Sequence, residues 1–144
     1  MGFYNILLHA HKGFAYLELL LVALFLVALL MTMFGYSGKV NNFLKKTTLF
    51  TMIFFHIQLL VGIVILFTSP GLKAVLAAGE LMKDGNRETF VEHPFSMIIC
   101  VILMTIINKK VKTAETINLK VVIMGILAIA LFAFAFPWTR VFGA

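Results

Sequence analysis

The sequence predicts an all-α fold, an integral membrane bundle of four helices that run up, down, up and down. Hydrophobic residues make up 62% of the chain and charged residues only 12%, whereas about 25% of the residues in a soluble domain are charged. Four apolar stretches approach the length of about 20 residues with which a helix crosses a bilayer. The basic residues gather in alternate connections between these stretches. Together these observations predict a multi-pass membrane protein.

The predicted spans form one transmembrane domain that takes up residues 1–144. The first has an almost unbroken apolar run, the second ends at Ser69 and Pro70, and the third reaches spanning length because its terminal lysines snorkel into the headgroups. An outer loop follows the second span, and its amphipathic stretch GLKAVLAAGELMKDG predicts a short helix on the membrane surface. The four predicted spans cover residues 14–36, 47–68, 92–110 and 120–139. The outer loop covers residues 69–91.

The charges of the connections predict the orientation of the bundle. Three lysines lie between the first two spans, and residues 109–120 contain four lysines and one glutamate. Residues 69–92 instead contain three basic and four acidic residues. By the positive-inside rule the two basic connections are cytoplasmic, so both termini and the outer loop face outward from a bacterial inner membrane. Because the net charge of +6 comes largely from these short loops, the sequence predicts a lipid bilayer, and no nucleic acid, as partner.

All four histidines lie in or beside the predicted spans, where ionisable side chains are costly and usually functional. His11 shares one helical face with Glu18 and Phe25, because residues seven apart return to nearly the same face. Glu18, a buried ionisable residue on this reading, must face the bundle or carry a proton. His9 points almost opposite to His11, since two residues turn a helix by about 200°. His9 is therefore interfacial unless the helix bends.

The third span has a face of soft ligands at spacings of four, three and four. Such a face can bind copper or hold a porphyrin. Methionine and cysteine also fill ordinary helical cores, and we prefer that interpretation for all members except the histidine at the outer mouth. The face consists of His93, Met97, Cys100 and Met104.

The second span places two polar residues on different faces of one helix. His56 lies near the middle of the membrane, and Gln58 is expected to form a hydrogen bond with another helix. A rise of about 1.5 Å per residue from the cytoplasmic lysines puts His56 at a depth of roughly 15 Å and His93 at roughly 24 Å. His93 therefore shares the outer half of the bundle with His11, and His56 lies deeper.

Two histidines that face each other from different helices can ligate a b-type heme axially, and helical bundles commonly build cofactor sites in this way. His11 and His93 are the pair predicted by depth. The propionates of a heme require cations near the interface, and Lys12 and Arg140 both belong to the outer side.

Four segments resemble a family of small bacterial proteins with four transmembrane helices that are labelled cytochrome b-like, and sometimes mislabelled as a ribosomal protein. The segments are LLHAHKG, FTMIFFHIQLLVGIVILFTSP, VEHPFSMII and FPWTR, and the resemblance covers nearly the whole chain. The elements HxH, HIQ and EHPxxM occur in the same order. The resemblance implies heme binding, which falls on His9, His11, His56 and His93. Glu18 lies where the family has mostly apolar residues.

The leading prediction is a heme b membrane protein that transfers electrons between a quinol and an outer redox protein, with His11 and His93 as axial ligands. An alternative is a copper or zinc site at the outer mouth, formed by His9, His11, His93 and Met97, with Glu92 as a further ligand. A third prediction has no cofactor: an accessory subunit of a larger membrane complex, in which the histidines form hydrogen bonds or a proton relay and Glu18 is prominent. No motif selects an enzymatic reaction.

Overall fold

A computed structural model describes residues 2–143, and every regular element in that range is helical. The prediction of an all-α fold is confirmed. Four long helices form the body, a short helix and one turn of π-helix lie in the loop after the second long helix, and a short helix ends the chain. In chain order these elements are α1 Phe3–Gly35, α2 Asn42–Thr68, α3 Pro70–Ala78, η1 Glu88–Glu92, α4 His93–Thr113, α5 Leu119–Ala135 and α6 Trp138–Phe142.

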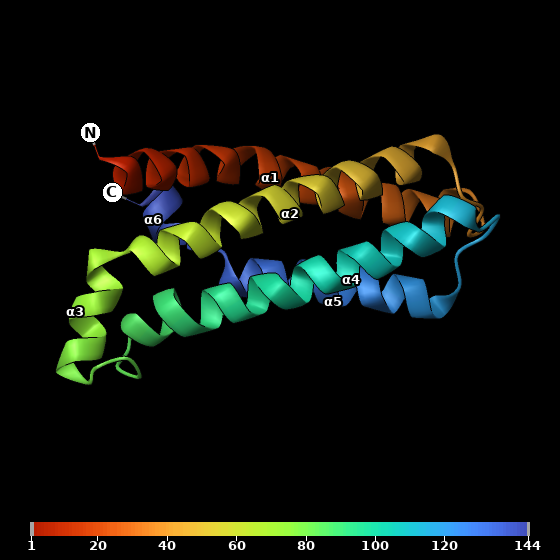
Figure 1. The fold of residues 1–144 in the computed structure, drawn as a ribbon. Helices are drawn as coiled ribbons and strands as arrows, with labels where there is room; N and C mark the ends of the chain where they lie inside the picture. The colour runs from red at the N-terminus through yellow and green to blue at the C-terminus, as the bar shows by residue number, and fades with distance from the viewer. Residues whose placement is uncertain (1, 144) are drawn as a thin grey trace.

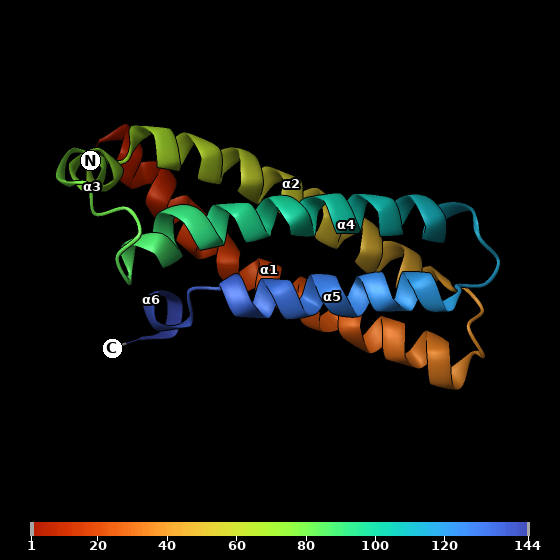
Figure 2. The same cartoon turned by 90° about the horizontal axis from the view of Figure 1, so that it is seen from below.

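The four long helices alternate in direction and lie side by side (Figure 1, Figure 2). α1 packs against α2, α2 against α4, α4 against α5, and α5 returns to contact α1. Within the described residues, three helices are long and apolar enough to cross a membrane: α1, α2 and the continuous stretch of η1 and α4. α5 is also apolar but has only 17 residues.

The outer surface of the bundle is apolar as well as its core. Large hydrophobic side chains such as Phe34, Phe67 and Phe95 are exposed on the helices, whereas a soluble monomer rarely exposes large contiguous apolar patches. The core runs between the helices and contains Phe25, Leu29 and Phe132, all fully buried. This distribution agrees with a protein whose surface faces lipid.

Side-chain caps determine where the later helices begin. The side chain of Asn41 accepts a hydrogen bond from the backbone nitrogen of Leu44 at 2.9 Å at the start of α2, and Asn118 does the same at the start of α5. Ser69 caps α3, and Pro70 follows it because a helix tolerates proline in its first turn. α2 therefore ends at Thr68, next to the predicted boundary at Ser69 and Pro70, and a short helix follows it in the loop.

Several helix ends differ from the predicted spans, and the start of α1 and the end of α5 bear on the site. α1 begins at Phe3, well before residue 14, because nothing in the polar start of the segment breaks the helix; His9 and His11 therefore lie in regular helix, without a bend. α5 ends at Ala135, before residue 139, because Pro137 cannot continue the helical hydrogen bonds. The chain then turns into α6, which lies beside the N-terminal part of α1 (Figure 1).

Candidate functional site

His11 is joined to α2 by two hydrogen bonds with one side chain. Its Nδ1 atom lies 3.1 Å from Oε1 of Gln58, and Nε2 of Gln58 donates to the backbone oxygen of His11 at 2.9 Å. Because the amide nitrogen of Gln58 is the donor in the second bond, its oxygen accepts in the first, and Nδ1 of His11 carries the hydrogen. The other ring nitrogen, Nε2, then has a free lone pair in the neutral imidazole. The expected hydrogen bond from Gln58 to another helix is confirmed.

Gly62 leaves space beside the free nitrogen of His11. A Cβ atom at this position would lie 3.5 Å from Cε1 and 4.0 Å from Nε2 of the ring. Gly62 is one turn beyond Gln58 on α2, so the helix that orients the imidazole also passes close to the Cε1–Nε2 edge of the ring without placing a side chain there.

His93 is the first residue of α4 and is bonded to the end of α5. Its Nδ1 atom donates to the backbone oxygen of Ala135 at 2.8 Å. A carbonyl oxygen can only accept, so Nδ1 carries the hydrogen here too. The carbonyl lies at the end of α5, where the break before Pro137 has released it from helical bonding. Nε2 of His93 is again the nitrogen with a free lone pair.

The two imidazoles lie together between α1 and α4. Their ring centroids are 6.2 Å apart and their planes are at 84°. Because a bond from a metal to an imidazole nitrogen is about 2.0–2.1 Å long, two imidazoles on opposite sides of one metal have centroids roughly 6 Å apart. Histidines that ligate metals almost always donate their other N–H to an oxygen, as both do here. The two rings thus lie close together, and each has its Nε2 atom without a hydrogen bond among the described residues.

The other residues predicted at the outer mouth, His9, Lys12 and Arg140, do not contact the histidine pair in any hydrogen bond of the described residues. His9 is exposed on α1, and Lys12 near it is also exposed; that His9 lies at the membrane interface stays a prediction. Arg140 of α6 is exposed and donates to the hydroxyl of Thr89 at 2.5 Å. The hydroxyl of Tyr16 donates to the backbone oxygen of Val141 at 2.7 Å and so holds α6 against α1. Two cations, Lys12 and Arg140, therefore lie at the end of the bundle that contains the histidine pair.

His56 lies on the outer surface of the bundle. Its Nδ1 atom donates to the backbone oxygen of Met52 at 2.8 Å, and its Nε2 atom lies 3.5 Å from the hydroxyl of Thr105 on α4. Thr105 is twelve residues after His93 on the same helix, which corresponds to about 18 Å along the axis. The structure thus does not bring His56 to the pair of His11 and His93, in agreement with the depth predicted from the sequence.

Glu18 is buried in the bundle, with only 7% of its surface exposed. It lies next to the side chain of Gln58 and faces Cys100 of α4. The predicted inward face of the first span is confirmed, because Ala15, Glu18 and Phe25 are all buried. Sequence reasoning missed the link between Glu18 and His11 through Gln58. The signal in the sequence was Gln58, a polar residue within an apolar span. Only the packing of α2 on α1 shows that its partners are His11 and Glu18.

The other predicted ligands do not join the histidine pair into a larger cluster. Among the described residues no group of three or more histidine, cysteine or acidic side chains could hold a metal ion. Cys100 donates to the backbone oxygen of Ala128 at 3.5 Å and is buried, and Met97 packs against the core. Glu92 accepts a hydrogen bond from Arg87 at 3.2 Å, and this bond raises the pKa of the Arg87 guanidinium.

No protein family, curated protein or solved structure was found to match the chain.

Proposed function

We propose that this protein is a membrane cytochrome that binds one heme b between His11 and His93 and transfers electrons near the outer face of a bacterial inner membrane. The observation that carries the proposal is the pair of imidazoles 6.2 Å apart, each with Nδ1 bonded to an oxygen acceptor and Nε2 free. Two neutral imidazole nitrogens are the axial ligands that a low-spin b-type heme requires. The chemistry supplied by a bound heme is the one-electron exchange between ferric and ferrous iron.

The proposal includes four membrane spans with both termini outside. α5 contributes the fourth, and its 17 residues correspond to about 26 Å of helix, close to the roughly 30 Å of a hydrocarbon core. The lysines at the cytoplasmic ends of α2, α4 and α5 support this orientation. With this topology the histidine pair lies in the outer half of the membrane, within reach of a quinol or an outer redox protein.

The chain's own residues have distinct tasks in this function. His11 and His93 would hold the iron, and Gln58 and the carbonyl of Ala135 fix the orientation of the two rings and keep the proton on Nδ1. Such hydrogen bonds make the opposite nitrogen a stronger ligand. Lys12 and Arg140 are the cations available to the propionates.

The test is the reduced-minus-oxidised absorption spectrum of protein purified gently from its native membrane, with metal analysis of the same sample. We expect the α-band of a b-type heme and one iron per chain. His11→Ala and His93→Ala should both lose the band, whereas His9→Ala, in which an exposed residue of the same helix is changed, should keep it. Protein that contains no heme would contradict the proposal.

A second candidate function is that of a cofactor-free accessory subunit of a larger membrane complex. The observation in its favour is that each histidine already connects two helices: His11 joins α1 to α2, and His93 joins α4 to α5. Hydrogen bonds between membrane helices stabilise a bundle by about 1 kcal/mol each. On this reading the purified protein has neither heme nor metal, and His11→Ala only lowers its thermal stability.

The alternative to heme is a copper or zinc ion that the protein binds directly, without a porphyrin. Zinc sites in proteins have three or four protein ligands, and the pair supplies two. The metal analysis in the same experiment distinguishes this alternative, because it would yield stoichiometric copper or zinc without the heme band.

A further inference from the structure

We propose that Glu18 is the proton-binding group coupled to electron transfer at the His11 and His93 site, and that it exchanges its proton with the outer face of the membrane only. This inference rests on the proposed function. It assigns a role to the one acidic side chain that the described residues bury inside the bundle.

Burial makes a permanent, uncompensated charge on Glu18 costly. The carboxyl group lies within a membrane-spanning helix with 7% of the residue exposed. The three ion pairs among the described residues all lie in the outer loop, between residues 80 and 92, and none includes Glu18. A carboxylate in such surroundings needs either a proton or a positive charge supplied by a bound group.

Gln58 connects Glu18 to the histidine pair. Its amide bonds to His11 through both of its polar atoms, and the same side chain lies next to the carboxyl group of Glu18. Glu18 itself is seven residues from His11 on α1, which is about 10 Å along the helix. At this separation the carboxyl group would not ligate a metal held by His11 but would interact with its charge, since the interior between them has a low dielectric constant.

Few other titratable groups face Glu18. On α1 the next one toward the outer face is His11, and α4 presents Cys100 and, closer to the mouth, His93. α2 contributes only the neutral amide of Gln58, because its histidine, His56, lies on the outside of the bundle. The described part of α5 has one charged residue, a lysine at its cytoplasmic end. Glu18 is therefore the acidic group positioned to balance a charge at the site.

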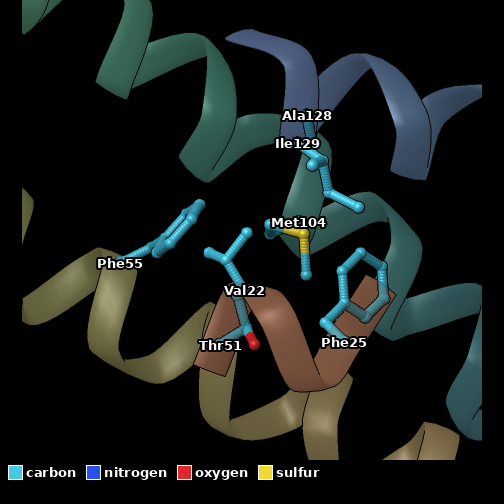
Figure 3. A pocket seen from close by; sticks show the side chains of 7 residues that line it. All are labelled: Val22, Phe25, Thr51, Phe55, Met104, Ala128 and Ile129. Atoms are coloured by element: carbon cyan, nitrogen blue, oxygen red, sulfur yellow. The ribbon is translucent and has the colours of Figure 1, made fainter. Parts of the chain in front are cut away.

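A tightly packed and mostly apolar layer lies on the side of Glu18 away from the histidine pair. Val22, Phe25, Phe55 and Met104 converge there from three helices (Figure 3), and the space between them is too small to admit a water molecule. The ring of Phe55 also stacks on that of Phe132 with centroids 5.5 Å apart. A proton needs a continuous chain of water or polar groups. The one polar side chain in this lining, Thr51, donates its hydroxyl to the backbone oxygen of Leu21 at 3.3 Å, and no water fits beside it to extend the chain. The remaining route leads outward past Gln58 and the histidine pair.

The coupling follows from charge balance. A heme held by His11 and His93 would supply one-electron exchange and would carry one more positive charge when oxidised than when reduced. The Glu18 carboxylate would offset that charge in the oxidised protein, and Glu18 would bind one proton from the outer aqueous side when a reduced donor such as a quinol supplies the electron. Glu18 would release the proton to the same side when the electron passes to an outer acceptor. One electron and one proton thus arrive and leave together.

The test is the midpoint potential of the heme as a function of pH in the wild type and in Glu18→Gln, which keeps the size of the side chain. The wild-type potential should fall as pH rises, with a slope approaching a tenfold change in the equilibrium constant per pH unit, or 59 mV. The variant should lose the slope and have the higher potential at alkaline pH, because it lacks the carboxylate that stabilises the oxidised state. Glu115→Gln, on an exposed cytoplasmic connection, is the matched control and should keep the wild-type slope.

Two measurements on the wild type do not depend on how the variant folds. The reduced-minus-oxidised infrared difference spectrum should contain the C=O band of a protonated carboxyl group, shifted in D2O. In oriented proteoliposomes the potential should follow the pH on the side of the termini only. A heme-loaded protein with no pH dependence, or with an unchanged slope in Glu18→Gln, would overturn this inference and leave the proposed function intact. Absence of the heme band would overturn the proposed function itself.

Discussion

The imidazole rings of His11 and His93 lie with their centroids 6.2 Å apart and their planes at 84°, and each ring is anchored by a different neighbour. Gln58 of α2 holds His11, and the carbonyl of Ala135 at the end of α5 holds His93. All four long helices therefore contribute to one pair of nitrogens. A change in the position of any helix alters a hydrogen bond that orients one of the rings, and this dependence leads to several of the predictions below.

Gln58→Leu is expected to weaken heme binding although both histidines remain. Leucine can neither accept from Nδ1 nor donate to the backbone oxygen of His11, so the ring loses its fixed orientation. Because a partner that orients a ligating histidine is worth about 10- to 100-fold in affinity, titration of heme into the apoprotein should reveal a loss of that order. Thr68→Ala is the control, since its hydroxyl bonds only within α2. Wild-type affinity in Gln58→Leu would show that the amide is not needed.

Gly62→Leu should abolish heme binding without changing any ligand. A Cβ atom at this position already reaches Cε1 of His11 at 3.5 Å, and the rest of a leucine side chain would cover the free nitrogen. Gly13→Leu, at a helical glycine with no atom within 4 Å of an added Cβ, should retain the heme band. Retention of the band in both variants would mean that the ligand does not approach His11 from the side of Gly62.

His56→Ala should leave the heme spectrum unchanged. The ring lies on the exposed side of α2, and its bonds are to Met52 in its own helix and, at 3.5 Å, to Thr105. The absorption spectrum and heme content of the purified variant test this prediction directly. Loss of heme in His56→Ala would favour the ligand set implied by the family resemblance over the pair of His11 and His93.

Gly125→Val should destabilise the bundle where α5 approaches α1. An added Cβ at Gly125 would lie 2.9 Å from Cδ2 of Leu29 and 3.5 Å from Cζ of Phe25, both in fully buried side chains. Overpacking of this kind costs about 1–3 kcal/mol, which thermal unfolding in detergent should detect as a lower midpoint. Leu29→Ala in the same chain removes the clashing methyl groups and should recover part of the loss. If the double variant loses more stability than the two single variants lose together, overpacking is the wrong explanation.

Cysteine labelling should locate the two kinds of connection on opposite sides of the membrane. In a Cys100→Ser background, Asp84→Cys lies in the outer loop and Glu115→Cys in the basic connection between α4 and α5, and both positions are exposed. A membrane-impermeant maleimide added to intact cells should label the first and not the second. Permeabilised cells should label both. The reverse pattern would contradict the orientation predicted from the loop charges.

Several features of the site could be read from local sequence because helical periodicity decides them. The spacing of seven residues places His11, Glu18 and Phe25 on one face, and the structure directs that face inward. The same count separates His9 from His11 and leaves His9 exposed. Counting residues along the spans was enough to separate the depth of His56 from that of His93. In each case the answer depends on one helix and its rise and turn per residue.

The partners of these side chains depend on how four helices pack, and no single segment contains that information. Gln58 was expected to bond to some other helix, but the close contact of α2 with α1 selects His11 as its partner. The bond from His93 to Ala135 exists because α5 ends before Pro137 and leaves a carbonyl free beside the start of α4. The sequence by itself determined an all-helical, apolar chain and the inward face of its first helix. Tertiary packing decided which inward groups meet, because rotation and depth of each helix are set by contacts with its neighbours.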